Sequence, residues 1–245
     1  MKTLIAFPLL VSLTSISLTS IAQMEIKAQR AELSLEQTQL LNKNIESYDV
    51  FSFSISELNA FVKSTSGNKK LIFQITSELS WNFVLEKNEI RSLDYQAILT
   101  SENGEISDPT ISECNTFGGY INDDPQQWVR FYISNGFFKG IIFDKQKGYY
   151  YIESISSYSK DAKNDRFVIY NLSKIKSDGS ICGVKTLERK FGQRMAESSN
   201  TSSVLSGIYR VLEVSTDADY EWYQAYGSNS NSEILSIMNT VDGIY

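Results

Sequence analysis

Hydrophobic and polar residues alternate along much of the chain between positions 51 and 170. In residues 79–86 every second position is Leu, Trp, Phe or Leu, and the positions between are mostly polar. A period of two predicts a β-strand with one buried face, because successive side chains of a strand point to opposite sides. Similar short segments predict further strands at residues 51–53, 71–76, 94–100, 114–121, 128–134, 137–143, 148–155 and 166–170.

Turn signals separate these segments. Asn135-Gly136 lies between two aromatic runs and predicts a hairpin with a primed turn, which needs positive φ at both central positions. Ser54 is expected to cap a short helix in which Leu58 and Val62 share one face. We therefore expect an α+β chain dominated by a mostly antiparallel β domain, sandwich or barrel-like, over residues 51–170.

The first residues have the pattern of a signal peptide. Lys2 precedes an apolar run over residues 4–13, and Ser20-Ile21-Ala22 fits the small-x-small rule for cleavage. The run is too short to span a bilayer. We expect residues 1–22 to be removed, the protein to be secreted without a membrane span, and residues 23–50 to form a polar leader.

Composition narrows the class of function. Hydrophobic residues make up 42% of the chain, enough for a full core. The net charge of −6 argues against a nucleic-acid partner, because such binding needs clustered Lys and Arg. The chain has two cysteines and no histidine, so it is not a disulfide scaffold and no imidazole can activate a thiol nucleophile.

Composition changes after residue 170. Residues 171–206 are rich in Lys, Arg, Gly and Ser and poor in apolar residues, which indicates an exposed connector open to proteolysis. The run Ser180-Ile181-Cys182-Gly183-Val184 lies within it. A thiol flanked by small residues in such a segment is suited to be presented to a partner.

Residues 207–245 begin with a strand-like run over 208–214. Asp217-Ala218-Asp219 can cap a short helix that ends at Gly227, and a second helix follows. One face of this second helix carries Ile234, Ile237, Met238, Val241 and Tyr245. Because such a stripe needs partners to bury it, we expect the sequence to end inside a second, incomplete domain that starts at residue 207.

The residues around Cys182 resemble the cysteine switch of reprolysin/adamalysin (ADAM-like) metallopeptidase zymogens. The propeptide pattern of that metzincin family is similar, in order and spacing, to four segments of this chain. They are Cys114–Ile121, Val129–Gly136, Gly140–Phe143 and Tyr149–Glu153. Residues 207–245 look like the first strand and helices of an α/β metzincin catalytic domain.

The resemblance implies a function for the whole precursor. In this family the Cys thiolate of the propeptide occupies the fourth position of a catalytic zinc, and cleavage of the connector removes it. The inhibitory ligand here is Cys182, and its partner is a catalytic domain in cis. The other zinc ligands are histidines of a His-Glu-x-x-His-x-x-Gly-x-x-His helix, so this chain alone should hold no zinc and hydrolyse no peptide.

Other interpretations stay open at this point. Cys114 and Cys182 could form a disulfide. The family's second propeptide cysteine is replaced here by Ser134 and Asn135, so the usual propeptide disulfide is not expected. The chain could also be a free-standing protease inhibitor, or a β-rich binding module without catalysis. Paired carboxylates, Asp123-Asp124 and Asp217 with Asp219, are expected to be caps of turns and helices.

Overall fold

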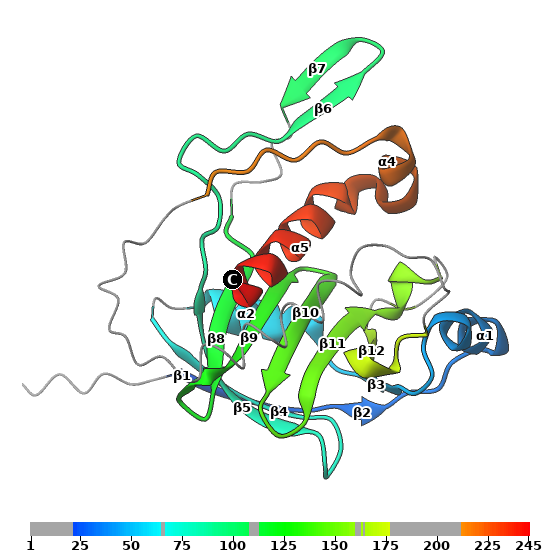
Figure 1. Ribbon diagram of the computed structural model, residues 1–245, viewed down its shortest axis with the longest axis vertical. Helices are drawn as coiled ribbons and strands as arrows, with labels where there is room; N and C mark the ends of the chain where they lie inside the picture. The colour runs from blue at the N-terminus through cyan, green and yellow to red at the C-terminus, as the bar shows by residue number, and fades with distance from the viewer. Residues whose placement is uncertain (1–21, 65–66, 108–112, 160–162, 164, 177–211) are drawn as a thin grey trace, which may run out of the picture.

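The computed structural model describes residues 22–64, 67–107, 113–159, 163, 165–176 and 212–245. The expected signal peptide, apart from Ala22, and residues 177–206 of the expected connector lie outside this part of the chain. The described helices and strands, drawn in Figure 1, are β1 (Ala22–Lys27), β2 (Gln29–Arg30), α1 (Leu35–Asn44), β3 (Asp49–Ser52), α2 (Ile55–Lys63), β4 (Lys69–Gln74), β5 (Ser80–Lys87), β6 (Ile98–Ser101), β7 (Gly104–Ser107), β8 (Thr116–Ile121), β9 (Asp124–Ser134), β10 (Phe137–Asp144), β11 (Gly148–Ser154), η1 (Ile155–Ser157), β12 (Arg166–Asn171), η2 (Leu172–Lys174), α4 (Tyr220–Tyr226), η3 (Gly227–Asn229) and α5 (Ser230–Ile244).

Ten of the described strands form one sheet in the order β1-β4-β5-β8-β9-β10-β11-β12-β3-β2. Every neighbouring pair is antiparallel except β1 and β4. This confirms the expected α+β class with a mostly antiparallel, barrel-like sheet. Strands β6 and β7 form a separate hairpin, which projects from the body of the molecule at the top of Figure 1.

The sheet is nearly closed by one segment of chain. Strands β1 and β2 lie at the two ends of the strand order, yet only Ala28 separates them in the sequence. The Ala28 N–H donates to the Gln74 carbonyl (2.9 Å), and the Ala31 N–H donates to the Val50 carbonyl (3.0 Å). Residues 22–31 therefore join the two edges of the sheet into a barrel, where the sequence had suggested a polar leader.

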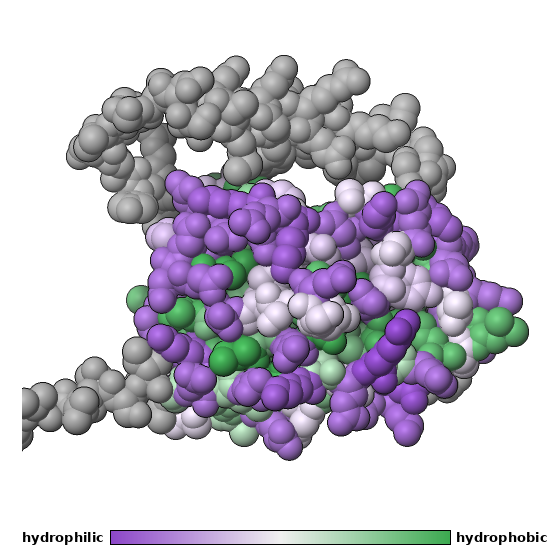
Figure 2. Space-filling model, turned by 90° about the horizontal axis from the view of Figure 1, so that it is seen from below, coloured by the Kyte–Doolittle hydropathy of each residue, from purple (hydrophilic) through white to green (hydrophobic). Residues whose placement is uncertain are grey.

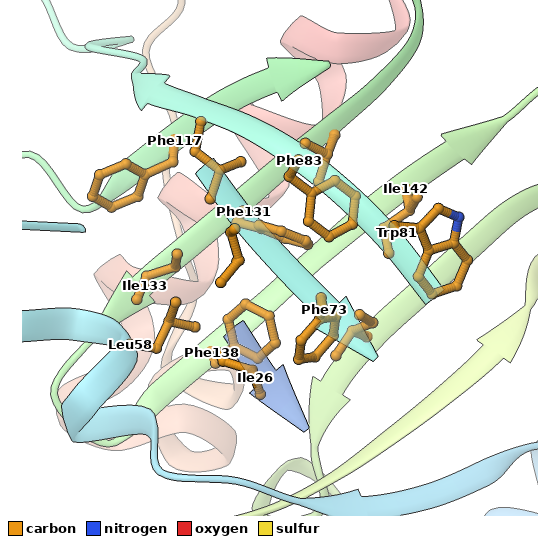
Figure 3. Packing of buried hydrophobic residues seen from close by; sticks show 14 of the residues in the cluster. Ile26, Leu58, Phe73, Trp81, Phe83, Phe117, Phe131, Ile133, Phe138 and Ile142 are labelled. Carbon is orange, nitrogen blue, oxygen red and sulfur yellow. The ribbon is translucent and has the colours of Figure 1, made fainter. Parts of the chain in front are cut away.

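Inward-facing side chains of the strands and of α2 fill the barrel. The α2 members are Ile55, Leu58 and Val62, and Ser54 caps the helix as expected. Aromatic rings meet edge to face across the core, as in the pair Phe83 and Phe131, whose centroids are 5.4 Å apart. Figure 3 shows these rings and the aliphatic side chains between them converging from several strands. The period-two pattern thus produces one continuous interior.

Two inward-facing glycines lie where neighbouring strands come close together. A Cβ atom built on Gly119 would lie 2.2 Å from the Val84 carbonyl oxygen, and one on Gly140 would lie 2.3 Å from the Arg130 carbonyl oxygen. Both distances are far below van der Waals contact. The sheet can curve this tightly at these positions only because they lack a side chain.

The turns differ in one respect from the expectation. Asn135-Gly136 does join β9 to β10, but only Gly136 has positive φ (83°). The turn with positive φ at both central residues is Asn122-Asp123 (51° and 59°), between β8 and β9. The hairpin prediction was therefore correct in place and wrong in turn type, and Asn and Asp adopt the left-handed conformation without glycine.

Helix α1 covers part of the outer surface of the barrel. Ser34 and Gln37 form a reciprocal capping box at its start. Leu41 packs with Val168 and Tyr170 of β12 in a second hydrophobic cluster. The polar residues of the expected leader cover the solvent side, and its few apolar residues hold it to the barrel. The face of the molecule in Figure 2 is correspondingly mostly hydrophilic, with separate hydrophobic patches.

Helix α5 packs on the opposite part of the outer surface, against β8, β9 and β10, and crosses these strands in Figure 1. Asp219 caps α4 and Gly227 ends it, as expected. Residues 212–214 form no strand, and 208–211 lie outside the described residues. The C-terminal helix thus has partners within this chain, which differs from the expectation that its partners belong to a further domain.

Candidate functional site

The expected inhibitory ligand, Cys182, lies outside the described residues. Cys114 is described: it is a half-buried free thiol just before β8. Its Sγ lies 3.8 Å from the Asn88 carbonyl oxygen and 3.5 Å from that of Thr116. Weak hydrogen bonds to two carbonyls hold the thiol in place.

An ion pair adjoins this thiol. Arg91 donates to both oxygens of Glu89, Nε to Oε1 at 2.7 Å and Nη2 to Oε2 at 2.6 Å, and Cys114 is close enough to interact with both residues. The hydrogen bonds from Arg91 lower the pKa of the Glu89 carboxyl. Arg91 thus forms a bidentate ion pair with Glu89 beside the thiol.

One member of each carboxylate pair noted in the sequence acts as a cap. Asp124 Oδ1 accepts from the Gln126 N–H at 2.9 Å, and Asp219 Oδ1 accepts from the Trp222 N–H at 2.8 Å. Asp123 is a turn residue with positive φ, and Asp217 is exposed. Within the described residues no group of three or more His, Cys, Asp or Glu side chains could hold a metal ion.

The most unusual polar cluster of the described residues lies between the sheet and α5. Lys139 on β10 contacts two carboxylates, Glu233 Oε2 of α5 at 2.8 Å and Glu153 Oε2 of β11 at 3.5 Å. All three residues are buried. Lys139 and Glu153 are directly paired across the two strands, so the sheet itself sets one ion pair and α5 adds the other. This group, Lys139, Glu153 and Glu233, is called the ion cluster below.

Two tyrosines donate hydrogen bonds to Glu153 of the ion cluster. Tyr158 donates to Glu153 Oε1 at 2.5 Å, and Tyr170 donates to the same oxygen at 2.8 Å. Burial, reinforced by the Glu153 charge, raises the pKa of both phenols well above the usual range. Both tyrosines therefore stay protonated and serve as hydrogen-bond donors.

The ion cluster keeps Lys139 charged. Burial alone would lower the pKa of its ammonium group, but Tyr151, Glu153 and Glu233 raise it above the ordinary value. A lysine held protonated cannot act as a nucleophile or a general base near neutral pH. The arrangement supports electrostatic fastening of α5 to the barrel.

Further hydrogen bonds fasten the C-terminal half of α5. The Asn239 amide donates to the carbonyl oxygens of Phe117 (3.3 Å) and Phe131 (3.0 Å), and Asn88 Nδ2 donates to Asn239 Oδ1 (2.9 Å). Asp242 pairs with Arg130 at 3.1 Å. The helix is thus held by polar groups along its length.

Sequence analysis missed this cluster, although one signal was available. Lys139 interrupts an otherwise apolar strand between Phe138 and Gly140, and a charged residue within such a strand indicates a buried partner. A pocket of about 630 Å³ also lies at the seam between β1 and the start of α2. Its lining includes Glu25, Lys27, Glu57 and Asp165.

Comparison with known proteins identifies no relative. No protein-family model matches the chain, and no curated protein matches it. In the part of the chain that the structure describes, every helix is too short or too polar to cross a membrane.

Proposed function

We propose that this chain is the N-terminal part of a secreted zinc metalloendopeptidase precursor, and that Cys182 keeps the protease latent as a ligand of its zinc. The resemblance is carried by the Cys182 segment and by strand motifs upstream of it. The zinc and its histidine ligands would belong to a catalytic domain in cis, since this chain has no histidine.

The observation that best supports this proposal is the position of the motif residues in the barrel. The pattern Cys-x-x-aromatic-x-Gly covers Cys114, Phe117 and Gly119, and Phe117 is fully buried while Gly119 is a point of close strand approach. Gly140 opens the Gly-aliphatic motif and is the second such point. The motif residues therefore coincide with positions that shape this barrel, which supports the proposal.

The proposal is tested in the complete precursor by comparing Cys182→Ala with Cys114→Ala. Removing the Cys182 thiol should release activity on a peptide substrate without cleavage of the connector. The matched variant Cys114→Ala should stay latent, because its thiol is hydrogen-bonded within the barrel domain to residues 88 and 116. Full latency of Cys182→Ala would exclude the cysteine switch.

Thiol labelling of this chain gives an independent check. Cys182 should react at the rate of an exposed thiol, and Cys114 should react slowly until denaturant is added, since it is half-buried and hydrogen-bonded. A Cys114–Cys182 disulfide found by mass spectrometry would contradict the proposal.

One observation favours a second candidate, a β-rich secreted binding module without catalysis. Residues 230–244 pack on the barrel through buried polar contacts, as expected of a helix that belongs to the same folded unit. This candidate predicts that Cys182→Ala has no effect on any protease activity, and that the chain binds no metalloendopeptidase in trans.

A further inference from the structure

Helix α5 is attached to the barrel by its polar face, the reverse of the usual amphipathic arrangement. Its buried residues are Glu233, Leu235, Ser236 and Asn239, of which only leucine is apolar. On the other side of the helix, Ile237, Val241 and Ile244 are 41%, 38% and 41% exposed. Much of the stripe that would normally hold a helix in place therefore faces solvent, although its members Ile234 and Met238 are half-buried.

The contacts that hold α5 can be replaced by water. They are mainly hydrogen bonds and ion pairs, such as Lys139 to Glu233 and Tyr132 to Ser232 (3.1 Å). A hydrogen bond between neutral groups adds little net stability, because both groups regain partners in water when they separate. The charged Lys139–Glu233 bond adds more. The apolar contribution comes from Leu235, which packs with Tyr132 and Phe137, and from Gly243, where an added Cβ atom would lie 2.6 Å from the Trp128 ring.

The barrel does not depend on α5 for its own core. The inner hydrophobic cluster contains side chains of the strands and of α2, and none of α5. Lys139 keeps Glu153 as a partner when Glu233 leaves, and Glu153 keeps the two tyrosine donors. Departure of the helix therefore leaves no buried charge without a partner, which is the usual large penalty for breaking a buried ion pair.

We propose that α5 is a releasable cover of the β8–β10 wall. It leaves the wall while the barrel stays folded, its helical hydrogen bonds open once it is released, and the Lys139–Glu233 ion pair controls how often this happens. This inference goes beyond the proposed function and holds whether or not Cys182 is a zinc ligand. Release uncovers Arg130, Tyr132 and Lys139 on the wall.

Native-state hydrogen exchange on the full chain tests the proposal. The amides of α5 should exchange through a local opening, roughly 100-fold faster than those of β9 and β10 and with little dependence on urea. Glu233→Gln, which keeps the shape but removes the charge, should speed exchange in α5 about tenfold and leave β9 and β10 unchanged. The matched control, Ile237→Gln on the exposed side, should leave both sets of rates nearly unchanged.

Equal exchange rates in α5 and the barrel strands would overturn the proposal, and so would a Glu233→Gln variant that accelerates both sets alike. A second measurement does not need the Glu233 variant to fold. Ser236 is buried and its hydroxyl has no hydrogen-bond partner, so Ser236→Cys, in a chain with Cys114 and Cys182 changed to Ser, reports release by thiol labelling. Labelling well above the global unfolding rate supports a releasable cover, and labelling at that rate contradicts it.

Discussion

At the scale of single residues, the two inward-facing glycines are the least replaceable positions of the barrel wall. Gly119→Ala and Gly140→Ala should each lower the free energy of unfolding by about 3 kcal/mol, the upper end of the usual cost of overpacking. The added methyl group would meet backbone carbonyl oxygens, which cannot move aside as a side chain can. Urea unfolding followed by tryptophan fluorescence measures the change.

Gly118→Ala is the matched control for these variants. A Cβ at Gly118 would lie 3.2 Å from the Arg130 guanidinium, which is the end of a flexible side chain. This variant should therefore stay within about 0.5 kcal/mol of the parent. Equal stability of all three variants would show that the strands do not approach as closely as described.

Tyr158 and Tyr170, which donate to Glu153 of the ion cluster, should make the stability of the protein sensitive to high pH. The pKa values of Tyr158 and Tyr170 are raised in the folded chain, so above pH 10 the unfolded chain loses these protons first. Stability is then fully present below pH 10 and falls as pH rises, by about 1.4 kcal/mol per pH unit for each such tyrosine. Urea unfolding at several values between pH 8 and pH 11 measures the slope.

The Tyr170→Phe variant separates the loss of stability that comes from this phenol from other effects of high pH. It should cost about 1.5–3 kcal/mol at pH 7, because it removes a hydrogen bond to a buried carboxylate, and it should make the alkaline slope shallower. Tyr120→Phe, at an exposed position, should change neither quantity. An unaltered slope in Tyr170→Phe would mean that the phenol does not retain its proton as described.

At the scale of elements, the turn between β8 and β9 is open to a direct test. Asp123 has φ of 59°, so Asp123→Gly should stabilise the protein slightly, by up to about 1 kcal/mol. Asp123→Ala should destabilise it, because alanine adopts this conformation less readily than aspartate. Thermal unfolding of the two variants compares them. The opposite order would indicate that the Asp123 side chain matters more than its backbone.

The strands were predictable because the period of two is a local property of the sequence. Residues 79–86 show it plainly, and β5 (Ser80–Lys87) follows it almost to the residue. The expected strand at residues 94–100 is shorter in the structure, and β6 begins only at Ile98. The β6–β7 hairpin is not part of the ten-stranded sheet. Residues 94–97 therefore have no neighbouring strand of the barrel to pair with.

Two features could not be read from local patterns. Residues 22–31 look like a polar leader in the sequence, because a strand that buries only one side chain, Ile26 in β1, leaves little hydrophobic pattern. The apolar stripe of α5 suggests a buried face, but the interface is formed by Glu233 and Asn239, whose partners come from distant strands. Carboxylates on a helix usually indicate the side that faces solvent. Because Glu233 is buried in an ion pair, this rule assigns the wrong side of α5 to the interface.

At the scale of the whole molecule, closure of the barrel by residues 22–31 can be tested at Ala28. Ala28→Pro removes the N–H that donates to Gln74 and should lower the free energy of unfolding by about 3 kcal/mol. Ala28→Ser keeps this donor and should have a small effect. If proline at this position is harmless, residues 22–31 are a separable leader after all, and the sheet is open.

The pairing of β3 with β12 sets the order in which this barrel can form. Strands β8 to β12 pair largely with their neighbours in sequence, but β3 must wait for β12, because Phe51 pairs with Phe167 far along the chain. Closing so long a loop is slow, since its entropy is lost before the contacts are gained. During synthesis, β3 therefore emerges long before the strand that will cover its free edge. The chain is most exposed to misassembly in that interval, so β12 is expected to form late in folding and to separate early in unfolding.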